Sequence, residues 1–203
     1  MQVHWPPCWH NIPTCEYMRA LERLQSLGLI RAIGLSDFPV ELIESARSCL
    51  ASSDVESIQV RFNPVELEAT IEHIPYAEAN SMTVLAWSPL AKGAVLGKYT
   101  VEEASRLEDV RSSEPLFHPE NYKQILSVAE VVRRVAQKRG KTPAQVALNW
   151  LITYSEAVVP IPGAKSPEQA RENAGAMGWR LSQDEFLEIL EASRRIRISR
   201  VTY

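Results

Sequence analysis

The chain has 203 residues, of which 45% are hydrophobic and 23% are charged, and its formal net charge is −3. A slightly negative surface of mixed sign argues against binding to nucleic acid or to an anionic membrane. No apolar run reaches the roughly 18 residues that a membrane span needs, and the first residues, MQVHWPP, lack the features of a signal peptide. We therefore expect a cytoplasmic globular domain, or part of a larger one.

The cysteines point in the same direction. Cys8, Cys15 and Cys49 make an odd number at no metal-ligand spacing, so a reduced, cytoplasmic protein is the simplest interpretation. The alternative is a zinc site made of Cys8 and Cys15 with His4 and His10. It is disfavoured because the C-x6-C spacing matches no known finger pattern.

The first half of the chain alternates short apolar strands with amphipathic helices. Strands are predicted at 2–5, 30–35, 58–62 and 83–87, and helices at 17–28, 40–50 and 71–80. Gly28 is the expected C-cap of the first helix, and Ser36 with Asp37 is expected to cap the second. Met1 is expected to lie inside a strand rather than before one.

The second half is mostly helical. A polar segment at 98–119 is predicted to be a long loop, with a short helix inside it as the alternative. Helices are predicted at 121–139, 142–154 and 182–194, the last with a capping box of Ser182 and Glu185. The basic tail, RRIRISRVTY, is predicted to be a loose surface segment.

The stretch VVPIPGAKSPEQARENAGA at 158–176 combines a strand with a helix start. Gly163 ends the apolar run, Ser166 is a good N-cap, and Pro167 suits the first helical position. A helix N-terminus offers free N–H groups, Gly163 lets the backbone approach a ligand closely, and Lys165 adds a positive charge. The stretch therefore predicts an anion site, with an ordinary strand-to-helix turn as the alternative.

The order of elements predicts an α/β fold. Short, nearly all-apolar strands that alternate with helices indicate a parallel sheet covered by helices. The strands start about 25 to 28 residues apart, which suits a (β/α) barrel as well as a doubly wound sheet. No G-x-G-x-x-G follows the first strand, which counts against a doubly wound dinucleotide-binding fold.

Candidate functional residues stand where the predicted strands end, because active residues of parallel α/β folds gather there. The five ends carry His4, then Ser36 and Asp37, then Gln59 to Asn63, then Trp87 and Ser88, then 163–166. Each has a structural alternative: a hydrogen-bonding role for His4 and Gln59, helix capping for Ser36 and Asp37, and core packing for Trp87. Their recurrence at consecutive strand ends, beside an anion site, favours a functional site.

Six motifs carry a family resemblance. They are QVHWP at 2–6, MRALERLQSLGLIRAIGLSDF at 18–38, IQVRFNP at 58–64, VLAWSPLAKG at 84–93, TPAQVALNWL at 142–151 and IPGAKSPEQARENAGA at 161–176. Together they resemble the C-terminal part of an aldo-keto reductase, over almost all 203 residues. The resemblance implies a partial (β/α)8 TIM barrel, with about five parallel strands equivalent to the fourth to eighth of the family.

The resemblance also implies a cofactor and a reaction. Members bind NADPH, less often NADH, and pass a hydride to a small-molecule aldehyde or ketone. A tyrosine protonates the carbonyl oxygen, helped by a lysine, an aspartate and a histidine, and His4 matches that histidine. Ser36, Asp37 and Gln59 match the carboxamide ligands, with Asp37 in place of the commoner Asn; an ionised Asp accepts but does not donate a hydrogen bond.

The remaining cofactor residues follow from the same resemblance. Trp87 matches the aromatic residue that stacks on the nicotinamide. Ser88, Leu90 and Gly93 match the pyrophosphate loop. The segment that binds the 2′-phosphate and adenine is matched by Gly163, Lys165, Ser166, Gln169, Glu172 and Asn173, and Lys165 supplies the cation that favours NADPH.

The departure from the family lies in the tetrad. Its Asp, Tyr and Lys stand on strands ahead of the HWP motif, and no tyrosine of this chain matches the proton donor. We expect a truncated reductase domain over 1–203 that is incompetent for turnover. The alternatives are a non-catalytic nucleotide-binding or regulatory half-barrel, a dimer that self-associates through open sheet edges, and a structural relic. The segment 98–119 gives no signature of a particular substrate.

Overall fold

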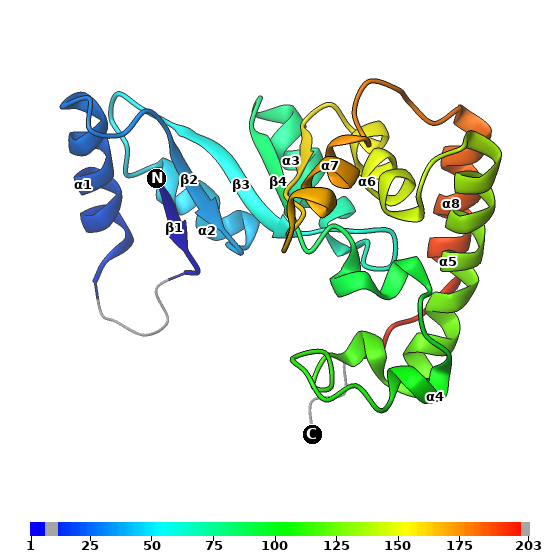
Figure 1. The fold of residues 1–203 in the computed structure, drawn as a ribbon. Helices are drawn as coiled ribbons and strands as arrows, with labels where there is room; N and C mark the ends of the chain where they lie inside the picture. Colours follow the sequence, from blue (N-terminus) through cyan, green and yellow to red (C-terminus); the bar gives the residue numbers. More distant parts are fainter. Residues whose placement is uncertain (7–11, 200–203) are drawn as a thin grey trace. The chain divides into compact units, whose positions relative to one another are not determined.

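Five strands form one parallel sheet in the order in which they occur along the chain (Figure 1). The computed structural model describes residues 1–6 and 12–199. The strands are β1 (Gln2–His4), β2 (Ile33–Ser36), β3 (Val55–Arg61), β4 (Thr83–Trp87) and β5 (Val158–Pro160). Sequential order is what repeated right-handed strand–helix–strand connections produce. The predicted α/β class and parallel sheet are therefore confirmed.

The chain divides into two compact units. Unit 1 comprises Met1–Arg61, Glu68–Ala86 and Ala157–Val159, and unit 2 comprises Phe62–Leu67, Trp87–Glu156 and Pro160–Tyr203. Most of the sheet belongs to unit 1, whereas the long helices of the second half of the chain belong to unit 2.

Unit 1 contains the helices α1 (Thr14–Ser26), α2 (Val40–Arg47) and α3 (His73–Ala79), and the short 3-10 helix η1 (Glu68–Thr70). Its core joins strand and helix side chains: Ile33, Leu35, Ile58, Val84, Met18, Ile43 and Ile74 are buried. The predicted start of β3 is three residues late. Glu56 and Ser57 interrupt the apolar pattern where the register between β2 and β3 shifts at Ile33 and Gly34.

A disulfide joins Cys15 in α1 to Cys49 just after α2, with the two Cα atoms 4.8 Å apart. The expectation of reduced cysteines is therefore wrong for this pair, because the reversal of the chain between α1 and α2 brings together residues 34 positions apart. The cytoplasmic location stays a prediction without the support of the cysteine count. Cys8 and His10 of the alternative zinc site lie outside the described residues. Within the described ranges, no three His, Cys, Asp or Glu side chains are grouped to hold a metal.

Glu22 makes a second link between α1 and the turn that follows α2. Its Oε1 accepts hydrogen bonds from the backbone N–H groups of Ser52, Ala51 and Ser53 at 2.7, 2.9 and 3.1 Å. These donors favour the charged form and hold the pKa of Glu22 at about 2. The carboxylate thus fixes a turn that the apolar pattern alone leaves undefined.

Four α-helices longer than one turn lie in the part of unit 2 that the structure describes: α5 (Pro119–Arg139), α6 (Pro143–Tyr154), α7 (Pro167–Ala174) and α8 (Gln183–Arg195). The short elements are η2 (Ala91–Leu96), α4 (Val101–Ala104) and η3 (Pro115–Phe117). Figure 1 shows α5 and α8 side by side, and the two helices pack together. Trp150 of α6 is fully buried, and its ring stacks on Phe186 at 5.6 Å and lies 5.7 Å from Phe62.

Two segments of unit 2 are more ordered than expected. The short helix allowed for at 98–119 is α4, which begins with a capping box of Thr100 and Glu103. The tail, expected to be loose, is held as far as Ser199. The side-chain amide of Asn121 donates to Ser199 O at 2.8 Å and accepts from Ser199 N at 2.9 Å, and Gln124 pairs with Arg197 in the same way. Amide side chains on α5 here bind the tail backbone as a neighbouring strand would.

Of the helices in the described part of the chain, none is both long enough and apolar enough to cross a bilayer.

The first prediction concerns the Cys15–Cys49 disulfide. Peptide mapping without reductant should recover these two cysteines in one linked peptide, protected from alkylation. Closing a loop of this length lowers the entropy of the unfolded chain, so Cys15→Ser should reduce the free energy of unfolding by about 3–4 kcal/mol. Two separately alkylated cysteines in the native protein would contradict the cross-link.

The second prediction concerns Glu185, a buried carboxylate at the start of α8. It accepts from Arg139 Nε at 2.8 Å and from Arg139 Nη2 at 2.5 Å, and it completes the capping box with Ser182. Arg139, followed by the Ser182 amide, lowers the pKa of Glu185 to about 2. Because the folded-state pKa lies below the unfolded one, the stabilisation is present above about pH 4.5 and is lost as the pH falls towards 2.

Glu185→Gln should therefore lower the free energy of unfolding by about 2–3 kcal/mol at pH 7, and the difference from wild type should shrink between pH 4.5 and 2. Urea unfolding followed by circular dichroism at several pH values measures this. The matched control is Glu188→Gln on the same helix. Glu188 pairs with Arg134 at the surface, and its loss should cost less than about 1 kcal/mol. Equal effects of the two variants would refute the prediction.

Candidate functional site

Three predicted site residues of unit 1 stand level with one another on adjacent strands. His4 of β1 pairs in register with Ser36 of β2, and Ser36 pairs with Gln59 of β3. Register partners in a parallel sheet project their side chains to the same face. The backbone thus places an imidazole, a hydroxyl and an amide in one row.

Asp37 follows this row and does not cap α2. The N-cap of α2 is Pro39, with no side-chain capping hydrogen bond, so the expected cap of Ser36 and Asp37 is wrong. The backbone of Asp37 is in the left-handed region, with φ 56°, whereas an N-cap residue has extended backbone angles. Its N–H donates to Gln59 O at 2.8 Å, and its Oδ2 accepts from Trp5 Nε1 at 3.2 Å.

Trp5 is a neighbour of the row that the sequence did not identify. Its ring stacks on His4 with centroids 4.7 Å apart, its backbone N–H donates to Ser36 O at 3.1 Å, and about half of its side chain is exposed. Trp5 therefore buttresses His4 and Asp37 at once. Its place beside His4 in the HWP motif was the only available signal.

In unit 2, the loop after β4 has an unusual backbone. Ser88, Ala91, Lys92 and Gly93 all have positive φ, at 51°, 51°, 52° and 92°. Such angles are costly for residues other than glycine, and they persist where the surroundings impose them, often at functional sites. Ala91 itself is fully buried, as are Ala94 and Val95, which follow these residues in the chain.

Asn63 helps to hold this loop. It is completely buried, and its Nδ2 donates to Ser88 O at 3.1 Å and to Glu66 Oε2 at 2.8 Å. Its Oδ1 accepts from Val65 N at 3.0 Å. Asn63 was predicted to end a strand and to stand among the candidate functional residues, and its tertiary contacts make it a support of the Ser88 turn.

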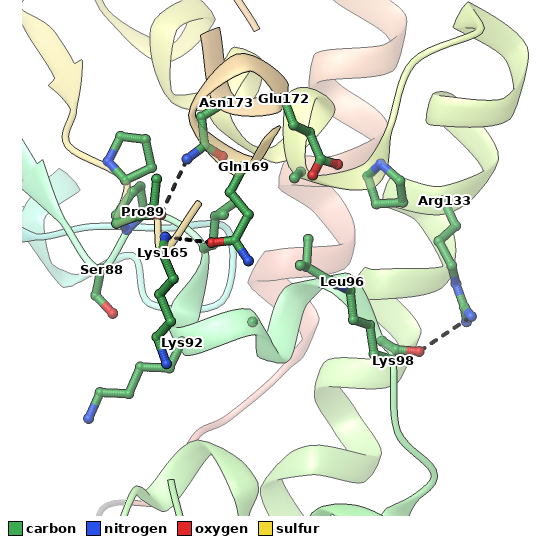
Figure 2. Close-up of a pocket in the computed structure, with 18 residues that line it drawn as sticks. Ser88, Pro89, Lys92, Leu96, Lys98, Arg133, Lys165, Gln169, Glu172 and Asn173 are labelled. Carbon is green, nitrogen blue, oxygen red and sulfur yellow. Dashed lines mark hydrogen bonds between the residues drawn. The ribbon is translucent and has the colours of Figure 1, made fainter. Parts of the chain in front are cut away.

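The turn between β5 and α7 forms as the sequence predicts. Ser166 is the N-cap of α7 and accepts from Gln169 N at 3.3 Å. Lys165 N donates to Gln169 Oε1 at 2.7 Å, and Asn173 Nδ2 donates to Gly163 O at 3.3 Å (Figure 2). The side chains of three predicted ligand residues, Ser166, Gln169 and Asn173, therefore also fix the shape of the turn.

These two loops line one cavity of about 910 Å³ in unit 2, within the usual size range of ligand pockets. Figure 2 shows it with Lys92 and Lys165 on one side and Arg133 on the other. Eight predicted residues line it: Ser88, Leu90, Gly93, Gly163, Lys165, Gln169, Glu172 and Asn173. Trp87 and Ser166 stand beside lining residues in the chain but do not line the cavity, and His4, Ser36, Asp37 and Gln59 belong to unit 1.

Several lining residues escaped the sequence analysis, among them Lys92, Lys98 and Arg133. Arg133 lies in the middle of α5, and it lines the cavity because Gly97 approaches that helix closely. A Cβ on Gly97 would lie 2.9 Å from Ala129 Cβ. No spacing rule signals such an approach in advance.

The cavity is electropositive. Lys92, Lys98, Arg133 and Lys165 line it against one carboxylate, Glu172, and the capped start of α7 adds its N–H groups. Lys92 forms an ion pair with the buried carboxylate of Glu114. The arrangement suits an anionic ligand.

The segment 98–118, without pattern in the sequence, is organised around Arg111. The guanidinium donates to Asp109 through Nη2 at 2.6 Å and Nε at 2.9 Å, and through Nη1 to the Tyr99 hydroxyl at 3.0 Å. It also lies over the ring of Phe117, 5.7 Å from the centroid. Arg111 lowers the pKa of Asp109 to about 2, and the charge of Lys165 contributes in the same direction. This segment thus places a carboxylate within the electrostatic reach of the cavity.

Sequential parallel strands that alternate with helices, with polar residues at the strands' carboxyl ends, define a protein built from consecutive β/α units of a barrel. Unit 2, taken by itself, has an electropositive cavity at a strand-to-helix turn. Comparison with known proteins agrees. The sequence model of the Aldo/keto reductase family matches residues 1–194, and the chain belongs to this family.

The curated relatives are longer than this chain. It is 31% identical to the aldo-keto reductase YhdN of Bacillus subtilis over 189 residues, which cover 93% of this chain and 56% of YhdN. It is also 31% identical to yakc of Schizosaccharomyces pombe, whose name specifies NADP(+), over 89% of this chain and 53% of that protein. The chain spans about half the length of these relatives.

Among solved structures, the glycerol dehydrogenase of Gluconobacter oxydans superposes with a TM-score of 0.85 at 29% identity, over all of this chain and 61% of that one. The fold is therefore part of a (β/α)8 barrel, as the resemblance implied.

Proposed function

We propose that this protein binds NADPH and that unit 2 holds the phosphates and adenosine of the cofactor. The observation that carries the proposal is the cavity itself, because it joins a left-handed loop, the capped start of α7 and Lys165. Relatives of similar sequence include a reductase whose name specifies NADP(+). Family membership and the cavity thus support the same ligand from independent sides.

The residues present fit such a group. A Cβ added to Gly93 or Gly163 would meet nothing within 4 Å, so both glycines leave open space at their backbone. Ser88, Leu90 and Gly93 would hold the pyrophosphate. Lys165 and Ser166, with Gly163 and Gln169, would hold the 2′-phosphate, and Glu172 with Asn173 would hold the adenosine. NADH, which lacks the 2′-phosphate, would forgo the contact with Lys165.

For the nicotinamide end we propose Ser36, Asp37 and Gln59 of unit 1 and Trp87 of unit 2, each as the family resemblance implies. Ser36 and Gln59 offer a hydroxyl and an amide for the carboxamide, and an ionised Asp37 accepts hydrogen bonds only. Trp87 would stack on the ring. His4 would donate a hydrogen bond to the oxygen of an aldehyde or ketone substrate. The bound cofactor would supply the hydride that the carbonyl carbon accepts.

Reduction to an alcohol also requires a proton on the carbonyl oxygen. The tyrosines of the described part lie in α1, α3, α5 and α6 or, for Tyr99, in the turn before α4, and none stands in a strand. We therefore propose that these 203 residues bind the cofactor without turnover, and that carbonyl reduction is an activity of the longer proteins of the family. Robust carbonyl reduction by the purified chain would refute the first part.

A second candidate, self-association, is favoured by the edges of the sheet. In the described part of the chain, β1 and β5 each have a neighbour on one side only. Met1 and Val159 are 63% and 44% exposed at these edges. Open parallel edges can pair with another chain, so sedimentation of the protein as a species heavier than 22.8 kDa would support a dimer.

The third prediction tests the phosphate end of the cofactor. Lys165→Met should weaken NADPH and adenosine 2′,5′-bisphosphate binding by about 10- to 100-fold, because a charge-assisted contact is lost. NADH affinity should change less than about threefold. Titration calorimetry measures all three ligands. Equal losses for NADPH and NADH would show that Lys165 does not read the 2′-phosphate.

The fourth prediction tests the nicotinamide end. If Trp87 stacks on the ring, NADPH should quench tryptophan fluorescence in the wild type, and Trp87→Ala should abolish that quenching. Binding of adenosine 2′,5′-bisphosphate, which has no nicotinamide, should be unchanged in the same variant. Quenching that survives the substitution would contradict the stacking role.

A further inference from the structure

The helix that forms one wall of the cavity, α7, is not held in place by hydrophobic packing. None of its eight residues is buried. Most helices of globular proteins owe their position to a buried apolar face. The position of α7 must therefore depend on polar contacts and on close backbone approach, and these come from α6.

Gln145 of α6 forms a hydrogen bond with Glu172, a residue of α7 that lines the cavity. Its Nε2 donates to Glu172 O at 3.1 Å. The oxygen of the same amide, Oε1, accepts a hydrogen bond from Thr142 N at 3.1 Å. The backbone N–H of Gln145 donates to Thr142 Oγ1 at 3.2 Å, which completes a capping box. One side chain thus caps its own helix with its acceptor and holds the next helix with its donor.

Gly175, directly after α7, makes this contact possible. A Cβ at this position would lie 2.2 Å from Gln145 Nε2 and 3.0 Å from Gln145 Cδ. The backbone itself would accept alanine, since Gly175 has φ −66° and ψ −4°. The requirement for glycine is therefore steric and comes from the amide of Gln145.

Asn149, one turn further along α6, holds the chain after α7. It is fully buried, and its Nδ2 donates to Ala176 O and Trp179 O, both at 2.9 Å. Its Oδ1 accepts from Leu181 N at 3.0 Å. The exit of α7 is thus anchored independently, which leaves the Gln145 contact to set the helix itself.

We propose that Gln145 is the positioning residue of the cavity: it sets α7 against α6 and so places Glu172 and the N–H groups at the start of α7 toward the ligand. The identity of that ligand rests on the function proposed above, whereas the positioning does not. Gln145 does not line the cavity and acts only through α7.

The two roles of Gln145 can be separated by a single substitution. Gln145→Glu keeps an acceptor for Thr142 N, since glutamate serves in capping boxes as well as glutamine does. It removes the donor to Glu172 O and sets a carboxylate against that carbonyl. The matched control, Thr142→Ala, breaks the capping box and leaves the donor in place.

The experiment is hydrogen exchange of the ligand-free full chain, followed by calorimetry. In Gln145→Glu, the amides of α7 should exchange at least about fivefold faster than in wild type while those of α6 do not, because one hydrogen bond is lost. Affinity for adenosine 2′,5′-bisphosphate should fall about three- to tenfold. Thr142→Ala should instead speed exchange at the start of α6 and leave this affinity unchanged.

Gly175→Ala provides a second, independent test from the other side of the contact. It should reproduce the faster α7 exchange of Gln145→Glu, because its methyl group displaces the Gln145 amide. In a Gln145→Ala background, the same change should no longer speed α7 exchange, since the two positions are coupled. Additive effects of the two substitutions would overturn the proposal.

The experiment distinguishes an error in the positioning role of Gln145 from an error in the assignment of the cofactor. Unchanged α7 exchange in Gln145→Glu overturns the positioning role, whatever the ligand. If wild type does not bind adenosine 2′,5′-bisphosphate, the cofactor assignment fails, and the exchange data still decide the role of Gln145.

Discussion

The parallel backbone pairing of β1, β2 and β3 is the interaction on which the arrangement of unit 1 depends. Because the register is His4 to Ser36 to Gln59, three side chains from distant parts of the sequence stand in one row. A slip of one residue on any strand would send its side chain to the other face of the sheet. Asp37 and Trp5 then extend this row through an indole–carboxylate hydrogen bond. The register of the strands therefore sets the relative positions of these side chains.

Unit 2 builds its cavity by different means. In the loop after β4, Ser88, Ala91, Lys92 and Gly93 adopt positive φ, and the side chains of Ala91, Ala94 and Val95 are fully buried. On the opposite wall, α7 buries no side chain and is held by amide groups of Gln145, Asn149 and Asn173. The contacts that α6 makes with α7 and with the chain after it are therefore polar.

Several tertiary features had no sequence signal. Arg111 organises 98–118 through Asp109 and Tyr99, yet charged residues in a polar segment show no periodicity. The tail is held by Asn121 from a position 78 residues away, and Cys15 pairs with Cys49 because two helices meet. Ser36 and Asp37 looked like a helix cap, but Pro39 takes that position. The first three misses share a cause, since the partner is chosen by spatial proximity, which local patterns do not encode. The missed cap has another, the left-handed backbone of Asp37.

What the sequence determined by itself was the set of local structures: strand and helix alternation, the Ser166 and Ser182 caps, and the Gly-Ala-Lys-Ser turn. These depend on propensity and on hydrogen bonds between residues three or four positions apart. The motifs also identified the family and eight of the residues that line the cavity. Only the tertiary structure decided the register of the strands, the inclusion of Lys92, Lys98 and Arg133, and the hold of Gln145 on α7. The physical reason is that these contacts join segments far apart in the chain, and their free energy becomes available only once the whole unit has packed.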